Sequence, residues 1–381
     1  MSFKARIEYL LRILERYFLP STTKLDKTRM LDEYCKICGL NRKYAIYQIN
    51  NYDPNREKKT KGRQSKYGTE VIYHLKKLYF YMDQICSKKM KAAIPIWLPL
   101  YEEPMSQECR TLLLSISAPT IDRLLRETKK AEIKKRNCTT KPGSIIKSRI
   151  PIKTLDADIK EPGFIEADTV AHCGNSLSGD FIWSITYTDV FSGWTSNRAV
   201  WNKGSQAIID KTKEVFNLLP FDVLSISVDN GSEFLNWALL DMLGKKKIDL
   251  YRSRPYKKND NCRVEQKNWT HVRSLFGYDR FDSTHLVFMI NNIYINYWNP
   301  YQNFFIPTIK LIQKTRIGAK IIKKYDSPQT PYKRILGNDK VPIAAKEKLQ
   351  AVFKRLNPFV LKKNIDENAI IIGIGPFTNF Y

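Results

Sequence analysis

Apolar residues recur at helical spacing near the start of the chain. In the stretch KTRMLDEYCKICGLNRKYAIYQINNY, Met30, Tyr34 and Cys38 follow one another at intervals of one helical turn. Gly39 then interrupts the series, and a second apolar series runs over 40–49. The pattern predicts two short helices joined through a glycine turn.

Two helices joined in this way are typical of a helix-turn-helix, whose second helix enters the major groove of DNA. Here the second helix carries Arg42 and Lys43 near its N-terminus, where base edges or phosphates are met. An ordinary helical hairpin gives the same pattern, so spacing alone leaves both interpretations open. The basic charge of this part of the chain favours DNA binding, and we assign a helix-turn-helix region to 1–60.

A second helical group is predicted over 61–130. Its last helix, SAPTIDRLLRETKK, has Ser117 as a predicted N-cap and presents Arg123 and Arg126. A second DNA-reading helix and a solvated helix face both fit this pattern. The next segment, 131–160, has no periodicity and contains proline and glycine, which predicts an extended basic linker.

The pattern changes to that of strands at Gly163. Runs rich in β-branched and aromatic residues alternate with helical patterns in the order βββαβαβαα. This order predicts an α/β core over 161–310, with a mixed five-stranded sheet flanked by helices. The predicted strands lie at 164–172, 180–190, 193–200, 223–228 and 248–253, and the predicted helices at 204–218, 232–243, 260–276 and 283–298.

Charge divides the chain in the same places. The 64 Lys and Arg exceed the 38 Asp and Glu by 26, yet the excess is +17 over 1–160, zero over 161–310 and +9 over 311–381. Solubility alone does not explain why the excess avoids one contiguous segment. The distribution is explained if the basic flanking segments bind a polyanion and the neutral core uses its carboxylates for chemistry. The last segment, 311–381, is therefore assigned as a small basic C-terminal region.

The cysteines and the apolar runs favour an intracellular protein. Seven cysteines at irregular spacing indicate a reducing compartment and no disulfide framework. Cys35 and Cys38 have the spacing of a zinc pair, but no second such pair follows, so core packing is the favoured interpretation. There is no signal-peptide pattern and no apolar run long enough to span a bilayer, which predicts a cytoplasmic, nucleoid-associated protein without membrane contact.

Three carboxylates carry the candidate chemistry. Asp168 lies mid-strand between apolar neighbours, Asp229 ends a buried strand, and Glu265 lies at the edge of a helical stripe that includes Val264 and Trp269. The 35 residues from 230 to 264 separate the last two. A cage of hard carboxylate oxygens is what two Mg²⁺ (or Mn²⁺) ions need for attack on a phosphodiester.

Other acidic residues and one histidine lie near the three carboxylates in sequence. Alternation puts Glu166 and His172 on the same strand face as Asp168, and His172 is too far along the strand to share its ligand. Glu166 is close enough to stay a candidate. We rank Asp189 and Glu233 as structural or supporting residues.

Residues 161–310 resemble the catalytic core of retroviral integrases, an RNase H-like fold with two aspartates and a glutamate preceded by 35 residues. Asp168, Asp229 and Glu265 lie at those three positions. The resemblance extends to bacterial insertion-sequence transposases through GDFIWSITYTDVFSGW, SVDNGSEF, RSRPYKKNDNCRVEQKNWTHVR, SPQTPYKRIL, GLNRKYAI and LSISAPTIDRLLR. After about Asn364 the tail IDENAIIIGIGPFTNFY departs from that family by lacking a charged helical ending.

The resemblance implies a DDE transposase. Its three carboxylates would hold two divalent ions, with Asp168 bridging them, and no covalent enzyme intermediate would form. Double-stranded DNA would be the partner, both as the terminal inverted repeats of a mobile element and as target, and joining two ends implies at least a dimer. A basic loop before the Glu265 helix would hold the scissile strand by its phosphates through Arg252, Arg254, Lys257 and Lys258.

Two other functions stay open at this point. A transposase-derived DNA-binding regulator would keep the helix-turn-helix and lose catalysis, although an intact triad argues against it. A plain nuclease acting on RNA:DNA hybrids would use the same core without a specific N-terminal DNA reader.

Overall fold

The structure is a computed structural model that describes residues 3–53, 66–130, 159–229, 234, 237–252 and 262–374. The chain divides into two compact units, Met1–Ser65 and Lys66–Tyr381. Within the described ranges, no helix is both long enough and apolar enough to cross a membrane. Of the predicted segments, most of the basic linker and of the loop before the Glu265 helix lie outside the described residues.

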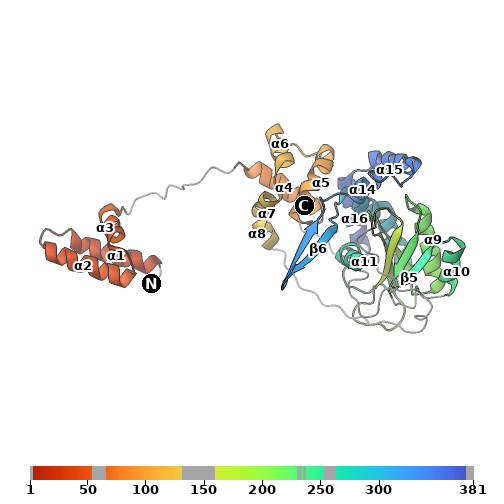
Figure 1. Ribbon diagram of the computed structural model, residues 1–381, viewed down its shortest axis with the longest axis horizontal. Helices are drawn as coiled ribbons and strands as arrows, with labels where there is room; N and C mark the ends of the chain where they lie inside the picture. The colour runs from red at the N-terminus through yellow and green to blue at the C-terminus, as the bar shows by residue number, and fades with distance from the viewer. Residues whose placement is uncertain are drawn as a thin grey trace. The chain divides into compact units, whose positions relative to one another are not determined.

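The first unit consists of three helices, α1 (Phe3–Tyr17), α2 (Lys24–Cys38) and α3 (Arg42–Asn51), as Figure 1 shows. α2 begins with a capping box, in which the Thr23 hydroxyl accepts from the Asp26 N–H and the Asp26 carboxylate accepts from Thr23. Gly39 ends α2 at a φ of 65°, a left-handed conformation that glycine adopts without strain. Asn41 then caps α3 by accepting from the Lys43 N–H. The two helices joined at Gly39 are those that the sequence predicts.

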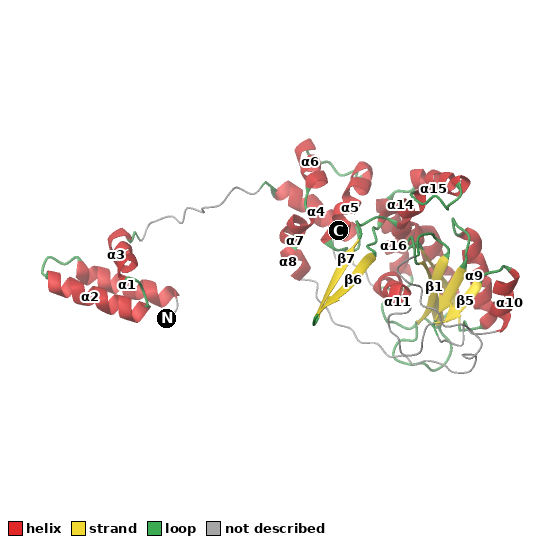
Figure 2. Cartoon of the chain, in the orientation of Figure 1, coloured by secondary structure: helices red, strands yellow, loops and turns green. Residues whose placement is uncertain are grey.

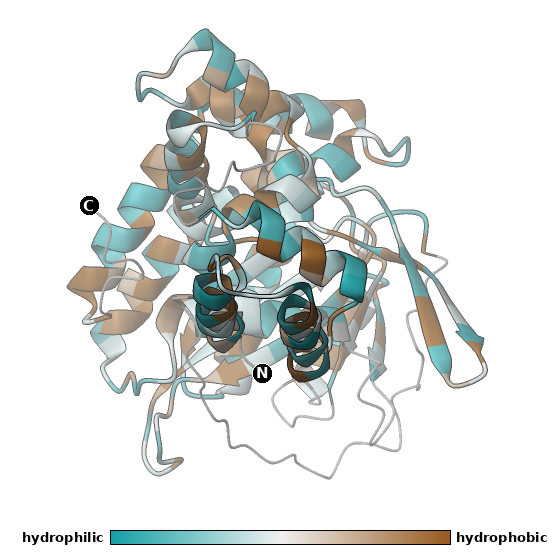
Figure 3. Cartoon of the chain, turned by 90° about the vertical axis from the view of Figure 1, so that its left-hand side faces the viewer, coloured by the Kyte–Doolittle hydropathy of each residue, from teal (hydrophilic) through white to brown (hydrophobic). Residues whose placement is uncertain are grey.

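Apolar positions from all three helices form a separate small core in this unit. In Figure 3 the helices beside the label N carry both hydrophilic and hydrophobic residues. Cys38 is buried in this core and Cys35 packs partly against it, as the interpretation as packing residues expects. The buried members are Leu10, Ile13, Leu31, Tyr34, Cys38, Ala45 and Ile49.

The second unit begins with the predicted helical group. Its helices are α4 (Thr69–Tyr81), α5 (Ser87–Trp97), η1 (Leu98–Leu100), α6 (Gln107–Ser115), α7 (Ala118–Leu124) and α8 (Arg126–Lys130). Ser117 caps α7 as predicted, because its hydroxyl accepts from the Thr120 N–H. The group shares one continuous hydrophobic core with the sheet region. The Trp97 indole, for example, donates to the Phe305 carbonyl at 3.1 Å.

A mixed five-stranded sheet forms the centre of the second unit, as predicted (Figure 2). Its strands lie in the order β3-β2-β1-β4-β5, antiparallel from β3 to β1 and parallel from β1 to β5. This is a helix-flanked α/β architecture of the RNase H-like type. The strands are β1 (Phe164–Ala171), β2 (Ile182–Asp189), β3 (Thr195–Trp201), β4 (Ser225–Val228) and β5 (Asp249–Arg252).

Helices cover both faces of the sheet. On one face the Tyr187 hydroxyl bonds the Thr212 hydroxyl of α9, and on the other face Asp168 contacts Asn268. The two predicted C-terminal helices of the core contain π-helical segments, and the second continues to Phe305. The elements are α9 (Ser205–Leu218), α10 (Trp237–Lys245), α11 (Cys262–Lys267), η2 (Asn268–Arg273), α12 (Ser274–Phe276), α13 (Thr284–Asn292), η3 (Ile293–Trp298) and η4 (Tyr301–Phe305).

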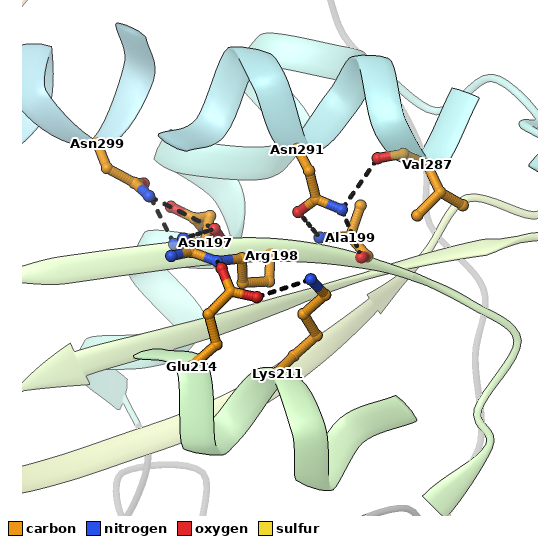
Figure 4. Close-up of polar contacts among 8 residues, drawn as sticks. All are labelled: Asn197, Arg198, Ala199, Lys211, Glu214, Val287, Asn291 and Asn299. Atoms are coloured by element: carbon orange, nitrogen blue, oxygen red, sulfur yellow. Dashed lines mark hydrogen bonds and ion pairs between the residues drawn. The ribbon is translucent and has the colours of Figure 1, made fainter. Parts of the chain in front are cut away.

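Three asparagine side chains cover the outer edge of β3, and Figure 4 shows two of them, Asn291 and Asn299. The Asn291 amide accepts from the Ala199 N–H at 2.9 Å and donates to the Ala199 carbonyl at 2.8 Å. Asn299 bonds both backbone groups of Asn197 in the same way, and Asn303 those of Thr195. Each carboxamide thus replaces the peptide group of a missing neighbouring strand, so an edge that would invite pairing with another chain is closed by a helix.

The C-terminal part follows the core directly. It consists of the hairpin β6 (Leu311–Ile317) and β7 (Lys320–Tyr325), followed by α14 (Pro331–Leu336), α15 (Ile343–Arg355) and α16 (Pro358–Ile371). The tail after about Asn364, which departs from the resembling family by lacking a charged helical ending, is nevertheless helical as far as Ile371. α16 continues to Ile371 because Ile365 and Ala369, one turn apart, are both buried in the main core.

Candidate active site

Asp168 lies on β1 and Asp229 follows directly after β4, at corresponding positions of these neighbouring inner strands. β1 and β4 are parallel, with Glu166 opposite Ser227 and Ala167 opposite Val228. Each aspartate follows directly after the last of these pairs. Neighbouring strands lie about 4.8 Å apart, so this register brings the two positions close together. Both residues are partly buried.

Glu265 lies on α11, a helix that packs against β1. The Val264 N–H donates to Glu166 Oε2 at 3.0 Å, and Asn268 Nδ2 donates to Asp168 Oδ2 at 2.6 Å. From 264 to 268 a helix rises about 6 Å, and from 166 to 168 a strand advances about 6.6 Å. The helix therefore runs along the strand in step with it. Glu265 lies one turn before Asn268, the residue that contacts Asp168, and its side chain is exposed.

Glu166 is the anchor of this arrangement. Its side chain is fully buried, and its carboxylate accepts from Arg263 Nη1 at 2.8 Å as well as from Val264. Burial raises the pKa of Glu166, whereas the charge and hydrogen bond of Arg263 oppose that rise. With both oxygens occupied by the first turn of α11, Glu166 serves to position the helix that carries Glu265.

The neighbouring candidates have structural contacts. Asp189 is buried and accepts from the backbone of Gly163 and Ser192, which closes the turn after β2. His172 is buried and bonds the Ser184 hydroxyl at 2.7 Å. Both side chains thus have hydrogen-bond partners within the fold. Glu233 lies outside the described residues.

One residue of the predicted helical stripe is misplaced. Trp269 is 62% exposed, whereas Val264 and Val272 are fully buried, so the prediction that Trp269 belongs to the apolar stripe is wrong. A position five residues after Val264 points about 140° away from it on an α-helix. The backbone widens to a π-helix at Asn268, which leaves Trp269 on the outer side. This exposed indole is a flat surface on which a nucleic-acid base can stack.

The predicted DNA contacts fall into three groups. Lys43, Arg123 and Arg126 are exposed, and Arg42 is exposed and ion-paired with Asp32. Arg252 is the last residue of β5 and is only 8% exposed, so it belongs to the sheet more than to a loop. The remaining three, Arg254, Lys257 and Lys258, lie outside the described residues.

The second unit contains a cationic cavity that sequence reasoning missed. It has a volume of about 1170 Å³, and eight Lys or Arg but only three Asp line it. Burial, and then the neighbouring Lys89 ammonium, lower the pKa of Lys267 to about 7. The Lys267 ammonium contacts His271 Nε2 at 3.1 Å. No sequence pattern signals this cavity, because its lysines come from segments far apart in the chain: α5, α11, the hairpin with the residue before it, and α16. The basic residues are Lys88, Lys89, Arg263, Lys267, Lys310, Lys323, Lys324 and Lys362.

Comparison with known proteins decides the family. Residues 159–258 match the model of the integrase core domain family. A protein of Sinorhizobium fredii (strain NBRC 101917 / NGR234), the uncharacterized protein y4rM, is 35% identical over 341 residues, 88% of this chain and 96% of that protein. The chain belongs to the y4rM family and carries an integrase core.

Two solved structures are similar to parts of the chain. The catalytic core domain of BIV integrase is 15% identical, over 30% of this chain and 70% of that one, with a TM-score of 0.25. A simian T-cell lymphotropic virus intasome, solved in complex with the PP2A regulatory subunit B56 gamma, is 17% identical. The match covers 45% of this chain and 56% of that one, with a TM-score of 0.27.

The integrase core sets the general activity of the chain. Proteins with this core are polynucleotidyl transferases in general and use divalent metal ions, so the chain has a function of the DNA integration or transposition type. The matched residues include Asp168 and Asp229 and end before Glu265. The role of Glu265 therefore depends on the resemblance and on the helix register described above.

Proposed function

We propose that this chain is a DDE transposase, which binds the ends of a mobile DNA element, cleaves them and transfers their 3′-hydroxyls into target DNA. The observation that supports this most directly is the register of β1, β4 and α11. This register supports the proposal because it is the arrangement that would bring Asp168, Asp229 and Glu265 together in an integrase core. Because two ends are joined, the active assembly contains at least two copies of the chain.

Asp168, Asp229 and Glu265 fit a divalent-metal site. All three side chains are carboxylates, the oxygen donors that Mg²⁺ and Mn²⁺ prefer. Two such ions would supply positive charge to the scissile phosphate and to the attacking and leaving oxygens. The chain's own part is to hold the carboxylates: Asn268 fixes one oxygen of Asp168, and the Thr169 N–H donates to the other at 2.8 Å.

The cationic cavity supports DNA as the substrate. Arg263, Gln266, Lys267 and Trp269 line it, and all four belong to the helix that carries Glu265. Phosphates bound by these cations would therefore lie next to the three carboxylates. In the helix-turn-helix unit, α3 leaves Tyr44 and Tyr47 exposed beside Lys43, a surface that suits groove contacts.

The test is a cleavage assay on supercoiled plasmid DNA that contains the gene for this chain together with its flanking sequence. With Mg²⁺ or Mn²⁺, the unaltered chain should nick at the element ends and join them to new sites. Asp229→Asn and Glu265→Gln should each lower the rate by roughly a thousandfold or more while DNA binding persists, since each removes one ligand of the ions.

Asp222→Asn is the matched control. Asp222 is exposed and precedes β4, at the end of the strand opposite to Asp229, so its neutralisation should leave cleavage unchanged. Activity that persists in Asp229→Asn would refute the proposal. Specific DNA binding without metal-dependent cleavage by the unaltered chain would favour the DNA-binding regulator instead.

A further inference from the structure

Three potential metal ligands come together in the helical group that precedes the sheet. Glu70 and His74 lie one turn apart on α4, and Cys109 lies in the first turn of α6. One oxygen, one nitrogen and one sulfur from these side chains lie within 4.8 Å of one another. Ligands on a tetrahedral zinc ion, bound at about 2.0–2.3 Å, lie roughly 3.5 Å apart. Small side-chain movements would close this difference.

The contacts of His74 prepare its ring for a metal. Nδ1 of His74 lies 3.0 Å from the Tyr101 hydroxyl, which donates its only proton to Glu103 Oε2 at 2.8 Å. Burial opposes it, but hydrogen bonds led by that of Lys77 lower the pKa of Glu103 to about 2, so this carboxylate can only accept. The Tyr101 oxygen must therefore accept from Nδ1–H. In the tautomer with the proton on Nδ1, the ring presents the Nε2 lone pair, the arrangement that metal-binding histidines have when a second partner holds the other nitrogen.

Two of the three proposed ligand side chains are buried, and that of Glu70 is exposed. His74 is 3% exposed and Cys109 is 1% exposed. Among the described residues, neither Nε2 of His74 nor Sγ of Cys109 makes a hydrogen bond. The two oxygens of Glu70 accept from the backbone N–H and the hydroxyl of Ser106, both at 2.7 Å, and each keeps a further lone pair. Nε2 of His74 and Sγ of Cys109 can therefore bind an ion without losing a hydrogen bond that the described residues show.

We propose that Glu70, His74 and Cys109 bind one zinc ion, with a water molecule as the fourth ligand on the exposed side of Glu70. The charges balance, because a carboxylate and a thiolate together neutralise Zn²⁺. Burial, and then the charge of Glu70, raise the pKa of Cys109, so the metal-free residue is a thiol. Zinc binding forms the Zn–S bond and releases that proton to solvent. The ion would join α4 to α6 and is separate from the Mg²⁺ chemistry proposed above.

The experiment uses the full chain, stripped of metal by a chelator and titrated with Co²⁺ in excess Mg²⁺. Co²⁺ replaces zinc at such sites, and a thiolate ligand gives it a charge-transfer band in the near ultraviolet that carboxylate sites lack. The band should saturate at one equivalent and disappear when Zn²⁺ is added. Tyr101→Phe, which removes the acceptor for Nδ1–H, should weaken zinc binding by about 10- to 100-fold.

The variants decide which cysteine binds. Cys109→Ser should abolish the band and His74→Gln should weaken binding by at least about tenfold, whereas the exposed Cys86→Ser should change neither. Chelation by Cys35 and Cys38 is checked with their double serine variant, which should retain the full band. No band in the unaltered chain, or its loss in that double variant alone, would overturn the proposal. Cleavage activity is not the readout, so failure of the transposase assay leaves this result interpretable.

Discussion

The asparagine cover of β3 gives a prediction with a calculable magnitude. Asn291→Ala removes the side chain that pairs with both backbone groups of Ala199, a residue with no exposed surface. An unpaired buried backbone group costs about 1–3 kcal/mol, and two groups are affected. Entry of a water molecule into the space left by the carboxamide would recover part of that cost. We therefore expect the free energy of unfolding of the second unit to fall by about 3 kcal/mol.

Urea denaturation followed by tryptophan fluorescence measures this change as a shift of the midpoint at constant slope. Asn296→Ala is the matched control, because Asn296 lies on the same long helix, is exposed and bonds only Asn292. It should change the free energy by no more than about 0.5 kcal/mol. If the two variants unfold at the same urea concentration, the Asn291 carboxamide does not stand in for a neighbouring strand and the interpretation of the edge is refuted.

Three further predictions concern the site. Asn268→Ala frees one oxygen of Asp168, so the Mg²⁺ concentration needed for half-maximal cleavage should rise about 10- to 100-fold, and an unchanged value would exclude the contact as a metal-site support. Glu166→Gln loses the charge that holds the start of α11, so the cleavage rate should fall while the Kd for DNA stays the same; a changed Kd with an unchanged rate would contradict this role. The pKa of Lys267 is lowered to about 7, so in the DNA-free protein its ammonium loses the proton as pH rises above 7. A bound phosphate would favour the protonated form and so raise that pKa. DNA affinity should therefore fall from pH 7 to 9 more steeply in the unaltered chain than in Lys267→Met, and equal slopes would rule out a phosphate contact at Lys267.

Much of the architecture follows from local pattern. Alternation and glycine positions predict the strands of the sheet, and the break at Gly39 predicts the turn between α2 and α3, because each depends on neighbouring residues only. The end of α16 was missed for the opposite reason. Its last turn is helical because Ile365 and Ala369 enter a core built by distant segments, and the tail alone gives no sign of that core.

The two aspartates are predictable from the sequence in a way that the glutamate is not. Once β1 and β4 are neighbours in a parallel pair, residues that follow corresponding positions must lie together. The position of Glu265 instead depends on how α11 is rotated and shifted against β1. That is set by the Val264 contact to Glu166, which joins residues 98 positions apart in the chain.

The same contact explains why a second acidic residue lies so close to Asp168. Alternation puts Glu166 on the face of Asp168, which by itself makes it a rival metal ligand. A buried carboxylate must be compensated, and here Arg263 and the Val264 N–H do so from the first turn of α11. Glu166 thereby holds the helix at Val264, and Asp168, two residues further along the strand, contacts the same helix at Asn268. The spacing of two residues between Glu166 and Asp168 matches one helical turn of α11, which is the geometric reason why both acids occur on one strand.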